Sequence, residues 1–385
     1  MIHIVVILTF AAVCIVWGMT TGYRCSCDPS RRTCDASLSA CPRRDAGRAS
    51  GLAVFMVCMV LGAGFGWRML DSSRLPPSSG EVTAGRTIMG TLWRITVRPG
   101  EGESRETARA AMAQAFAEVE RVDDLMSTWR DDTPISAVNA GAGGAPVAAP
   151  IELCAIVERG LEWGARSGGA FDVTFAGFGR LWRLGDDDFA PPAPDAIAAA
   201  RARVDYRRVS VSDGHIGLAG ADMAIGLGGI AKGYGVDRAA LALEAAGFDY
   251  YLVDGGGDVR VSTPPGEPPW RVGVRDPRGR AGVLLCELEV ESGAVATSGD
   301  YERFRIHEGV RYHHIIDPRT GLPASATQAV TVTAPDAETA DALATAVFVL
   351  GSDRGLELIE ETPGASGFII DAAGRQSGVP HATTR

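Results

Sequence analysis

The spacing of apolar residues along the chain predicts a mixture of short strands and longer helices. Residues 92–97 (Leu-Trp-Arg-Ile-Thr-Val) alternate between apolar and polar roughly as in a strand with one buried face. Short apolar runs that are bounded by turn residues predict further strands at 251–253, 295–297, 314–316 and 330–333. The strands are therefore spread along the chain and are not gathered in one block.

Helical periodicity is clearest in four segments. From Glu106 to Met126, apolar residues recur at intervals of three and four. The other predicted helices are 151–167, 232–246, and one that starts near Pro335 and ends at Gly351. Strands and helices follow no regular βαβ order, so we expect one α+β domain over 81–385, with a Ser- and Pro-rich linker at 68–80 before it.

Two segments near the N-terminus, 1–19 and 51–67, contain no Asp, Glu, Lys or Arg. Each is just long enough to cross a bilayer. The loop between them, 20–50, carries six arginines against three aspartates, and the positive-inside bias places it in the cytoplasm. We therefore expect an inner-membrane anchor with the following domain in the periplasm. The alternative is that 43–67 is a signal peptide, although no clean small-x-small cleavage site closes it.

Charge and cysteine content narrow the class of protein. The net charge of −10, without a basic stripe in the body, argues against a nucleic-acid binder. Six of the eight cysteines lie in the first sixty residues, and the spacing of Cys25, Cys27, Cys34 and Cys41 fits no standard zinc site. The two cysteines in the body lie in apolar surroundings and are expected to be small buried hydrophobes.

Asp341 and Thr345 are four residues apart on the last predicted helix, so they share one of its faces. Their neighbours are nearly all apolar, which predicts a buried helix. An unpaired carboxylate there would be costly. A magnesium ion, which takes carboxylate and neutral oxygen ligands, would remove that cost. A carboxylate that caps a neighbouring backbone fits the pair equally well.

A glycine-rich segment, residues 226–233 (Gly-Leu-Gly-Gly-Ile-Ala-Lys-Gly), ends where a helix is predicted to begin. It matches neither the Walker A pattern nor GxGxxG. A glycine-rich turn into a helix N-terminus nevertheless suits a phosphate or pyrophosphate, and Lys232 would add a positive charge. The alternative is a tight turn with a solvated lysine.

Several polar groups follow predicted strands or helices. Asp172 can accept hydrogen bonds from an adenine amine or a ribose, or can be an ordinary turn carboxylate. The segment 254–258 (Asp-Gly-Gly-Gly-Asp) is either a functional surface or a tight bend. The turn 298–301 (Ser-Gly-Asp-Tyr) presents groups that an active site can use. His314 can act as a general base for a hydroxyl or be structural, and His313 must point to the opposite face of the predicted strand.

In their order along about 81–374, these motifs resemble the ApbE family, the FAD:protein FMN transferases. The segments that carry the resemblance are 89–91 (Met-Gly-Thr), 127–139, 169–174 with Leu181-Trp182, 228–237, 254–260, 295–301, 314–321 and 341–345. One position departs from the family, because many members carry an acidic residue that contacts FAD where this chain has Gly226.

The resemblance implies a single flavin-transferase domain of mixed sheets and helices, with FAD as substrate and Mg²⁺ as cofactor. It implies metal ligation by Asp341, Thr345 and the backbone carbonyl of Gly229. It implies that His314 is the catalytic base and that Lys232 neutralises the pyrophosphate. The FAD contacts that it implies are Met89, Trp129, Ala170, Phe171, Asp172, Lys232 and Ile315, with Trp129 stacking on adenine.

The implied reaction is attack by a Thr or Ser hydroxyl of an acceptor protein on the FMN phosphorus, with AMP as the leaving group. A flavinylated subunit of a respiratory complex is the expected acceptor. The N-terminal membrane segment and cysteine-rich tail resemble small maturation factors of the sodium-pumping NADH:quinone oxidoreductase, which makes that complex one candidate. The alternatives are a Mg²⁺-dependent FAD pyrophosphatase and a membrane-tethered flavin-binding protein without turnover.

Overall fold

The computed structural model describes residues 80–179, 181–379 and 383–384. The two uncharged segments, the arginine- and cysteine-rich loop and all of the linker except Gly80 lie outside the described residues. Within those ranges, no helix combines the length and the hydropathy that a transmembrane span requires.

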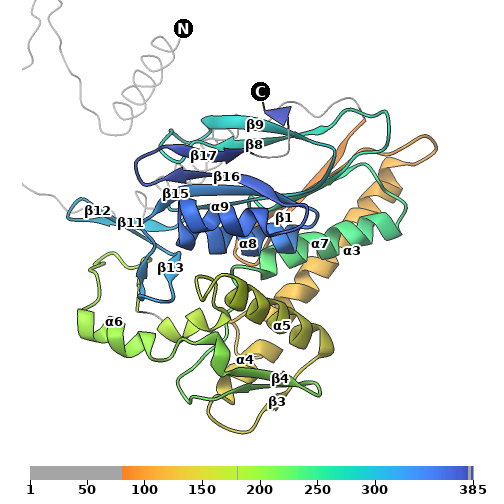
Figure 1. The fold of residues 1–385 in the computed structure, drawn as a ribbon. Coiled ribbons are helices and arrows are strands. Elements are labelled where there is room, and N and C mark those ends of the chain that lie inside the picture. Colours follow the sequence, from red (N-terminus) through yellow and green to blue (C-terminus); the bar gives the residue numbers. More distant parts are fainter. Residues whose placement is uncertain (1–79, 180, 380–382, 385) are drawn as a thin grey trace, which may run out of the picture. The chain divides into compact units, whose positions relative to one another are not determined.

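An antiparallel sheet of eight strands forms the centre of the domain (Figure 1). Its spatial order is β1 (Val82–Ile88), β2 (Thr91–Val97), β6 (Tyr251–Gly255), β7 (Val259–Ser262), β10 (Ser292–Gly299), β15 (Thr327–Ala334), β16 (Ser366–Asp371) and β17 (Gln376–Val379). Every neighbouring pair runs antiparallel. The sheet therefore brings together strands that are far apart in sequence, such as β2 and β6.

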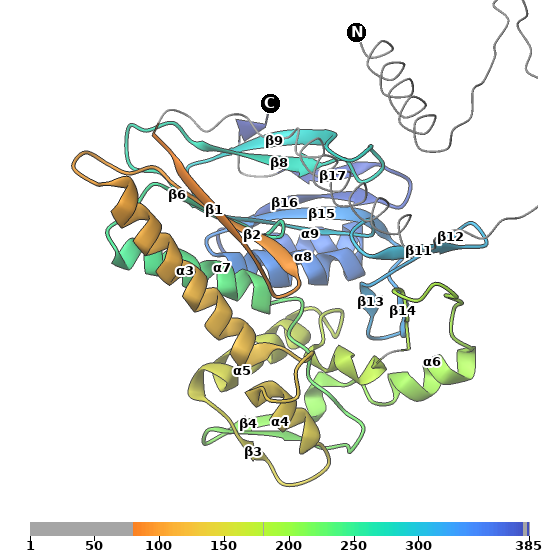
Figure 2. The ribbon, with the colours of Figure 1, turned by 180° about the vertical axis from the view of Figure 1, so that it is seen from behind.

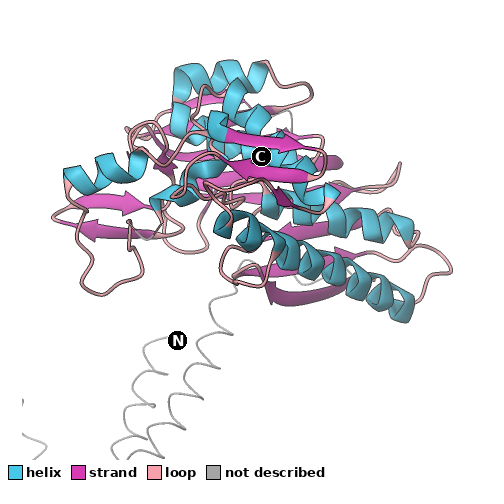
Figure 3. Ribbon diagram, turned by 90° about the horizontal axis from the view of Figure 1, so that it is seen from below, coloured by secondary structure: helices cyan, strands magenta, loops and turns pink. Residues whose placement is uncertain are grey.

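Four helices cover one face of this sheet. They are α3 (Arg105–Met126), α7 (Ala231–Ala245), α8 (Ala337–Leu350) and α9 (Ser352–Glu360). Figure 2 shows α3 lying beside α7, and Figure 3 shows the helices against the strands from below. Because strand side chains alternate between faces, Ile95, Val253 and Ala296 all point to the helices and are buried in the larger of two cores.

A smaller sheet covers the opposite face of the main sheet. It consists of β18 (Thr383–Thr384), β9 (Leu284–Val290) and β8 (Trp270–Arg275), seen above the main sheet in Figure 1. Val259 and Val261 of β7 pack there in a second core with Val272 and Leu288. The domain is thus layered as helices, sheet and sheet, which confirms the α+β class.

The remaining elements form a smaller lobe and a set of short hairpins beside the layers. The lobe contains α4 (Pro134–Ala140), β3 (Val147–Ala148), α5 (Ile151–Arg166), a 3₁₀ helix η1 (Val173–Phe178), α6 (Pro194–Arg201), η2 (Tyr206–Arg208), β4 (Val209–Ser212) and β5 (His215–Leu218). The hairpins are β11 (Phe304–His307) with β12 (Val310–His313), and β13 (Ile316–Asp317) with β14 (Leu322–Pro323). Cys154 on α5 is a buried free thiol, and Cys286 on β9 is a half-buried one.

The four predicted helices agree with the structure to within about two residues at their ends, but the strand predicted at 314–316 is wrong. β12 ends at His313 and β13 begins at Ile316, so His314 and Ile315 lie in a bend between two strands. The bend exists because the chain changes partner there, from β11 on one side to β14 on the other. His314 therefore lies at a junction between two hairpins.

Candidate active site

The N-terminal ends of α7 and α8 meet in direct backbone contact. A Cβ atom at Gly233 would lie only 2.1 Å from the carbonyl oxygen of Ala337, so glycine is required for this approach. The amide of Gly233 donates to Oδ2 of Asp341 at 3.1 Å. Asp237 of α7 accepts from the amides of Ala337 and Glu338, each at 2.9 Å, and so caps α8. The two helices hold each other in register.

Lys232, in the first turn of α7, lies between two buried carboxylates. Its Nζ pairs with Oδ2 of Asp258 and lies 3.5 Å from Oδ1 of Asp341. Asp258 follows the tight turn after β6, and Asp341 is on α8. The solvated lysine considered from the sequence is therefore wrong. The backbone-capping role considered for Asp341 is present, but it occupies only one of that residue's oxygens.

This cluster contains more negative charge than positive charge. Burial and the neighbouring charge of Asp341 raise the pKa of Asp258 to about 7, even though Lys232 opposes the shift. The pKa of Lys232 is raised as well, because the two carboxylates outweigh the effect of burial on the ammonium. Two carboxylates share one ammonium group, so an additional cation would be stabilised here.

Thr345, one turn further along α8, faces the glycine-rich segment. A Cβ atom at Gly229 would lie 3.3 Å from Oγ1 of Thr345 and 3.0 Å from the ring of Phe171. Ser298, at the end of β10, places its Oγ 3.5 Å from Oγ1 of Thr345. The structure thus brings together three predicted site residues from distant segments, and the hydroxyl of Ser298 lies beside them.

His313 and His314 lie in different surroundings, although the strand whose two faces they were predicted to occupy is absent at His314. His313 is buried, and its Nε2 lies 2.7 Å from the carbonyl oxygen of Ala324. His314 keeps part of its surface accessible to solvent. The pKa of His314 is lowered to about 4 because the surrounding protein desolvates the ring and because His313, Arg303 and Lys232 add positive charge nearby. His314 is therefore neutral at pH 7 and can accept a proton.

The short segment before η1 is folded inward. Ala170 and Phe171 are buried. Asp172 caps η1, and its Oδ1 accepts from the amide and hydroxyl of Thr174 at 2.7 and 2.6 Å. Its Oδ2 accepts from the amide of Tyr206 at 2.9 Å. Burial raises the pKa of Asp172. Both carboxylate oxygens of Asp172, which was predicted to contact adenine or ribose, thus accept hydrogen bonds from the protein itself in this conformation.

Three further predicted FAD contacts lie in different surroundings. Met89 occupies the turn between β1 and β2 with a φ of +51°, and its Sδ would lie 3.8 Å from a Cβ atom at Gly235 of α7. Ile315 is buried in the larger core. Trp129, after α3, has 85% of its surface exposed. An indole this exposed leaves its ring faces free for stacking.

The unusual glycine at position 226 is explained by a neighbouring ring. A Cβ atom there would lie 3.0 Å from both the ring of Phe175 and the Cβ of Ala176. Phe175 therefore fills the space that a longer side chain at position 226 would need.

The polar groups of the turn 298–301 are mostly structural. Both oxygens of Asp300 accept from the guanidinium of Arg278 at 2.7 Å. Tyr301 is buried, and burial raises its pKa to about 12. Of this turn, Ser298 alone lies against a predicted site residue.

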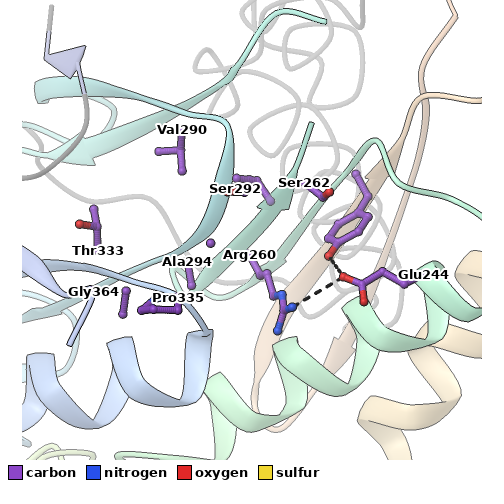
Figure 4. Close-up of a pocket in the computed structure, with 13 residues that line it drawn as sticks. Glu244, Arg260, Ser262, Val290, Ser292, Ala294, Thr333, Pro335 and Gly364 are labelled. Carbon is purple, nitrogen blue, oxygen red and sulfur yellow. Dashed lines mark hydrogen bonds and ion pairs between the residues drawn. The ribbon is translucent and has the colours of Figure 1, made fainter. Parts of the chain in front are cut away.

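A pocket of about 460 Å³ lies at the other end of β10 (Figure 4). It contains Gly293, whereas the site contains Ser298, and five residues of a strand span about 17 Å. Three of its polar side chains contact one another, since the hydroxyl of Tyr251 donates to Glu244 and Arg260 pairs with Glu244, as Figure 4 shows. The predicted site residues do not line it.

Sequence reasoning did not find the pairing of Asp258 with Lys232 or the position of Arg303 beside His314. The segment 254–258 did attract attention for its glycines, but the pairing of Asp258 with Lys232 depends on the position of α7 over β6 and β7. Arg303 precedes β11, and its carbonyl oxygen accepts from the amide of His314 at 3.1 Å. Local sequence shows neither that Asp258 pairs with Lys232 nor that Arg303 lies beside His314.

Comparison with known proteins agrees with this architecture. The profile of the ApbE family matches residues 89–369. An FAD:protein FMN transferase of Treponema pallidum is 39% identical over 308 residues, which are 75% of this chain and 84% of that protein. One from Klebsiella pneumoniae is 33% identical over 298 residues, covering 74% and 83%.

Solved structures show the same fold. The ApbE protein of Thermotoga maritima superposes with a TM-score of 0.70 at 31% identity, covering 77% of this chain and 96% of that one. The flavin transferase ApbE of Vibrio cholerae gives 0.68 at 29% identity, covering 78% and 96%.

Proposed function

Because the chain belongs to the ApbE family, we propose that it transfers the FMN half of FAD to a Thr or Ser hydroxyl of an acceptor protein and releases AMP. The observation that carries this proposal is the convergence of Gly229, Lys232, Asp341 and Thr345 where α7 and α8 meet. The relatives in Treponema pallidum and Klebsiella pneumoniae, both FAD:protein FMN transferases, support it.

The donor set fits Mg²⁺. Asp341, Thr345 and the carbonyl of Gly229 would hold the ion, since they offer one carboxylate and two neutral oxygens. The surplus negative charge of Asp258 and Asp341 over Lys232 supports a cation here. When bound, the ion supplies a Lewis acid that neutralises charge on the pyrophosphate oxygens.

The protein's own groups perform the remaining tasks. Lys232 faces the pyrophosphate as a fixed positive charge. His314, neutral at pH 7, accepts the proton of the acceptor hydroxyl. The bond from that oxygen to the FMN phosphorus forms while the bond from phosphorus to the AMP oxygen breaks. The displaced oxygen leaves with AMP, and FMN remains attached through a phosphoester.

We place the catalytic domain outside the inner membrane, where flavinylated subunits of respiratory complexes present their modified residue. A subunit of a sodium-pumping NADH:quinone oxidoreductase is one acceptor that fits this location. The uncharged segments 1–19 and 51–67 support the location.

Mass spectrometry of a candidate acceptor incubated with the protein, FAD and Mg²⁺ tests the activity. Transfer gives a covalent FMN adduct on a Thr or Ser and one AMP per adduct. Free FMN and AMP without an adduct would identify a pyrophosphatase instead. Unchanged FAD, with acceptors from several complexes, would identify a flavin-binding protein without turnover.

A further inference from the structure

Lys232 by itself supplies too little positive charge for the pyrophosphate that it is proposed to face. Lys232 is paired with Asp258 and lies close to Asp341, so its charge is already more than balanced. Asp254, which accepts from the amide of Gly257 at 2.9 Å, adds a further acidic group near Asp258. With a divalent cation in this cluster, the net charge of the cation, Lys232 and the neighbouring aspartates would be only about zero or +1. The phosphates of FAD carry two negative charges, so the site needs another positive group.

Arg303 lies where such a group is needed. Its Nη2 would be 3.9 Å from a Cβ atom at Gly90, in the turn that also holds Met89. Its backbone is bonded to His314, and its charge acts on the imidazole together with that of Lys232. Arg303 therefore lies between the predicted base and the turn with a predicted flavin contact.

Arg303 differs from the other arginines of the same hairpin. Arg305 donates to the carbonyl oxygens of Leu184 and Gly185 at 2.7 and 3.2 Å. Arg311 contacts Asp300 and lies over the ring of Phe304 at 3.9 Å. The guanidinium of Arg303 is exposed and forms no hydrogen bond or ion pair with the part of the chain that the structure describes. Its five donors are free for a ligand.

We propose that Arg303 binds phosphate oxygens of FAD and stabilises the negative charge that moves onto the AMP oxygen during transfer. This role rests on the proposed flavin transfer. A guanidinium suits it because its planar fork can hold two oxygens of a phosphate at once. In the same step the P–O bond to AMP breaks, and the oxygen that leaves gains the charge that Arg303 faces.

The test compares Arg303→Gln and Arg303→Lys with Arg109→Gln, which removes another exposed arginine, from α3. FAD binding is measured by fluorescence titration without acceptor, with and without Mg²⁺. Arg303→Gln should weaken FAD binding roughly ten- to hundredfold, as expected for a charge-assisted contact. The FAD dissociation constant of Arg303→Lys should lie between those of the wild type and Arg303→Gln. That of Arg109→Gln should match the wild type.

Two further readouts separate ligand binding from a structural role. The thermal unfolding temperature of ligand-free Arg303→Gln should equal that of the wild type, because the side chain has no partner to lose among the residues that the structure describes. The transfer rate of Arg303→Gln should begin to fall at a higher pH than that of the wild type. Without Arg303, only His313 and Lys232 would still lower the pKa of His314 through their charge, so His314 would take up its proton at a higher pH.

An unchanged FAD dissociation constant in Arg303→Gln would overturn the proposal. A lowered unfolding temperature, with FAD binding restored by stabilising the fold, would also overturn it in favour of a structural role. If the wild type binds FAD but modifies no acceptor, the proposed transfer fails, while the titration still decides whether Arg303 binds the phosphates.

Discussion

Asp341 is a buried acidic residue on a mostly apolar helix, and one of its oxygens accepts from the amide of Gly233. We predict that Asp341→Ala abolishes Mg²⁺-dependent transfer, because the charged ligand of the cation is lost. Mg²⁺ titrations of transfer activity check this. Asp353→Ala, an exposed acidic residue of α9, is the control. Activity close to the wild type at ordinary Mg²⁺ would remove Asp341 from the metal site.

Lys232 stabilises the fold as well as facing the substrate. In Lys232→Ala, Asp258 and Asp341 would remain buried without their ammonium. We expect the free energy of unfolding to fall by about 3 kcal/mol, the cost of breaking a buried ion pair. Adding Asp258→Asn should recover part of that loss, since it removes one uncompensated carboxylate. Denaturant unfolding of both variants measures this, and no recovery in the double variant would contradict the charge argument.

The lowered pKa of His314 predicts how stability depends on pH. The folded state holds this imidazole neutral down to about pH 4, whereas an unfolded histidine takes up its proton near its ordinary pKa of about 6.5. The unfolded state therefore binds more protons between these values, and stability falls as the pH drops through that window. Unfolding at pH 7 and pH 5 should show a larger loss for the wild type than for His314→Gln. Equal losses would show that His314 titrates normally.

At the scale of elements, the contact between α7 and α8 depends on the absence of a side chain at Gly233. Gly233→Ala would place a methyl group against the carbonyl of Ala337 and push the helices apart. We expect a loss of about 1–3 kcal/mol in unfolding free energy, as is typical of overpacking. FAD binding should weaken too, because Asp341 moves away from Lys232. Gly185→Ala, which meets nothing within 4 Å, is the control.

Helices were easier to predict from the sequence than the strands around His314. The apolar rows of α3 and α8 span several turns, so a single residue that departs from the pattern does not change the prediction of a helix. The run His314-Ile315-Ile316 is apolar enough for a strand, but its backbone partners are β11 and β14 in turn. Which partner a short run finds depends on the tertiary fold, and the sequence of three residues carries no information about it.

At the scale of the whole molecule, the spatial order of the strands was beyond sequence reasoning. β6 and β7 lie between β2 and β10, and this order places the turn containing Asp258 beside Lys232. Gly229, Asp341 and Thr345 were predicted because the chain resembles a known family in those motifs. Asp258 and Arg303 were missed because their roles depend on contacts between segments distant in sequence.

The location of the domain is tested with the whole chain. We predict that a reporter active only outside the membrane is active when fused after Asp71 and inactive when fused after Cys41. The two uncharged segments and the basic loop between them are the reason. The reverse result would place the domain in the cytoplasm. Activity of both fusions would mean that 1–19 is not a span.

The surplus of carboxylates at Lys232 also couples the occupancies of two ligands. Without a cation, the approaching pyrophosphate meets net negative charge, so FAD should bind more weakly than it does with the metal present. Linkage is reciprocal, so FAD must raise the affinity for the cation by the same factor as the cation raises the affinity for FAD, typically about 5- to 150-fold. Flavin loading would then follow the free Mg²⁺ concentration of the compartment. The flavin-loaded protein that an acceptor meets would then be one that also holds the metal.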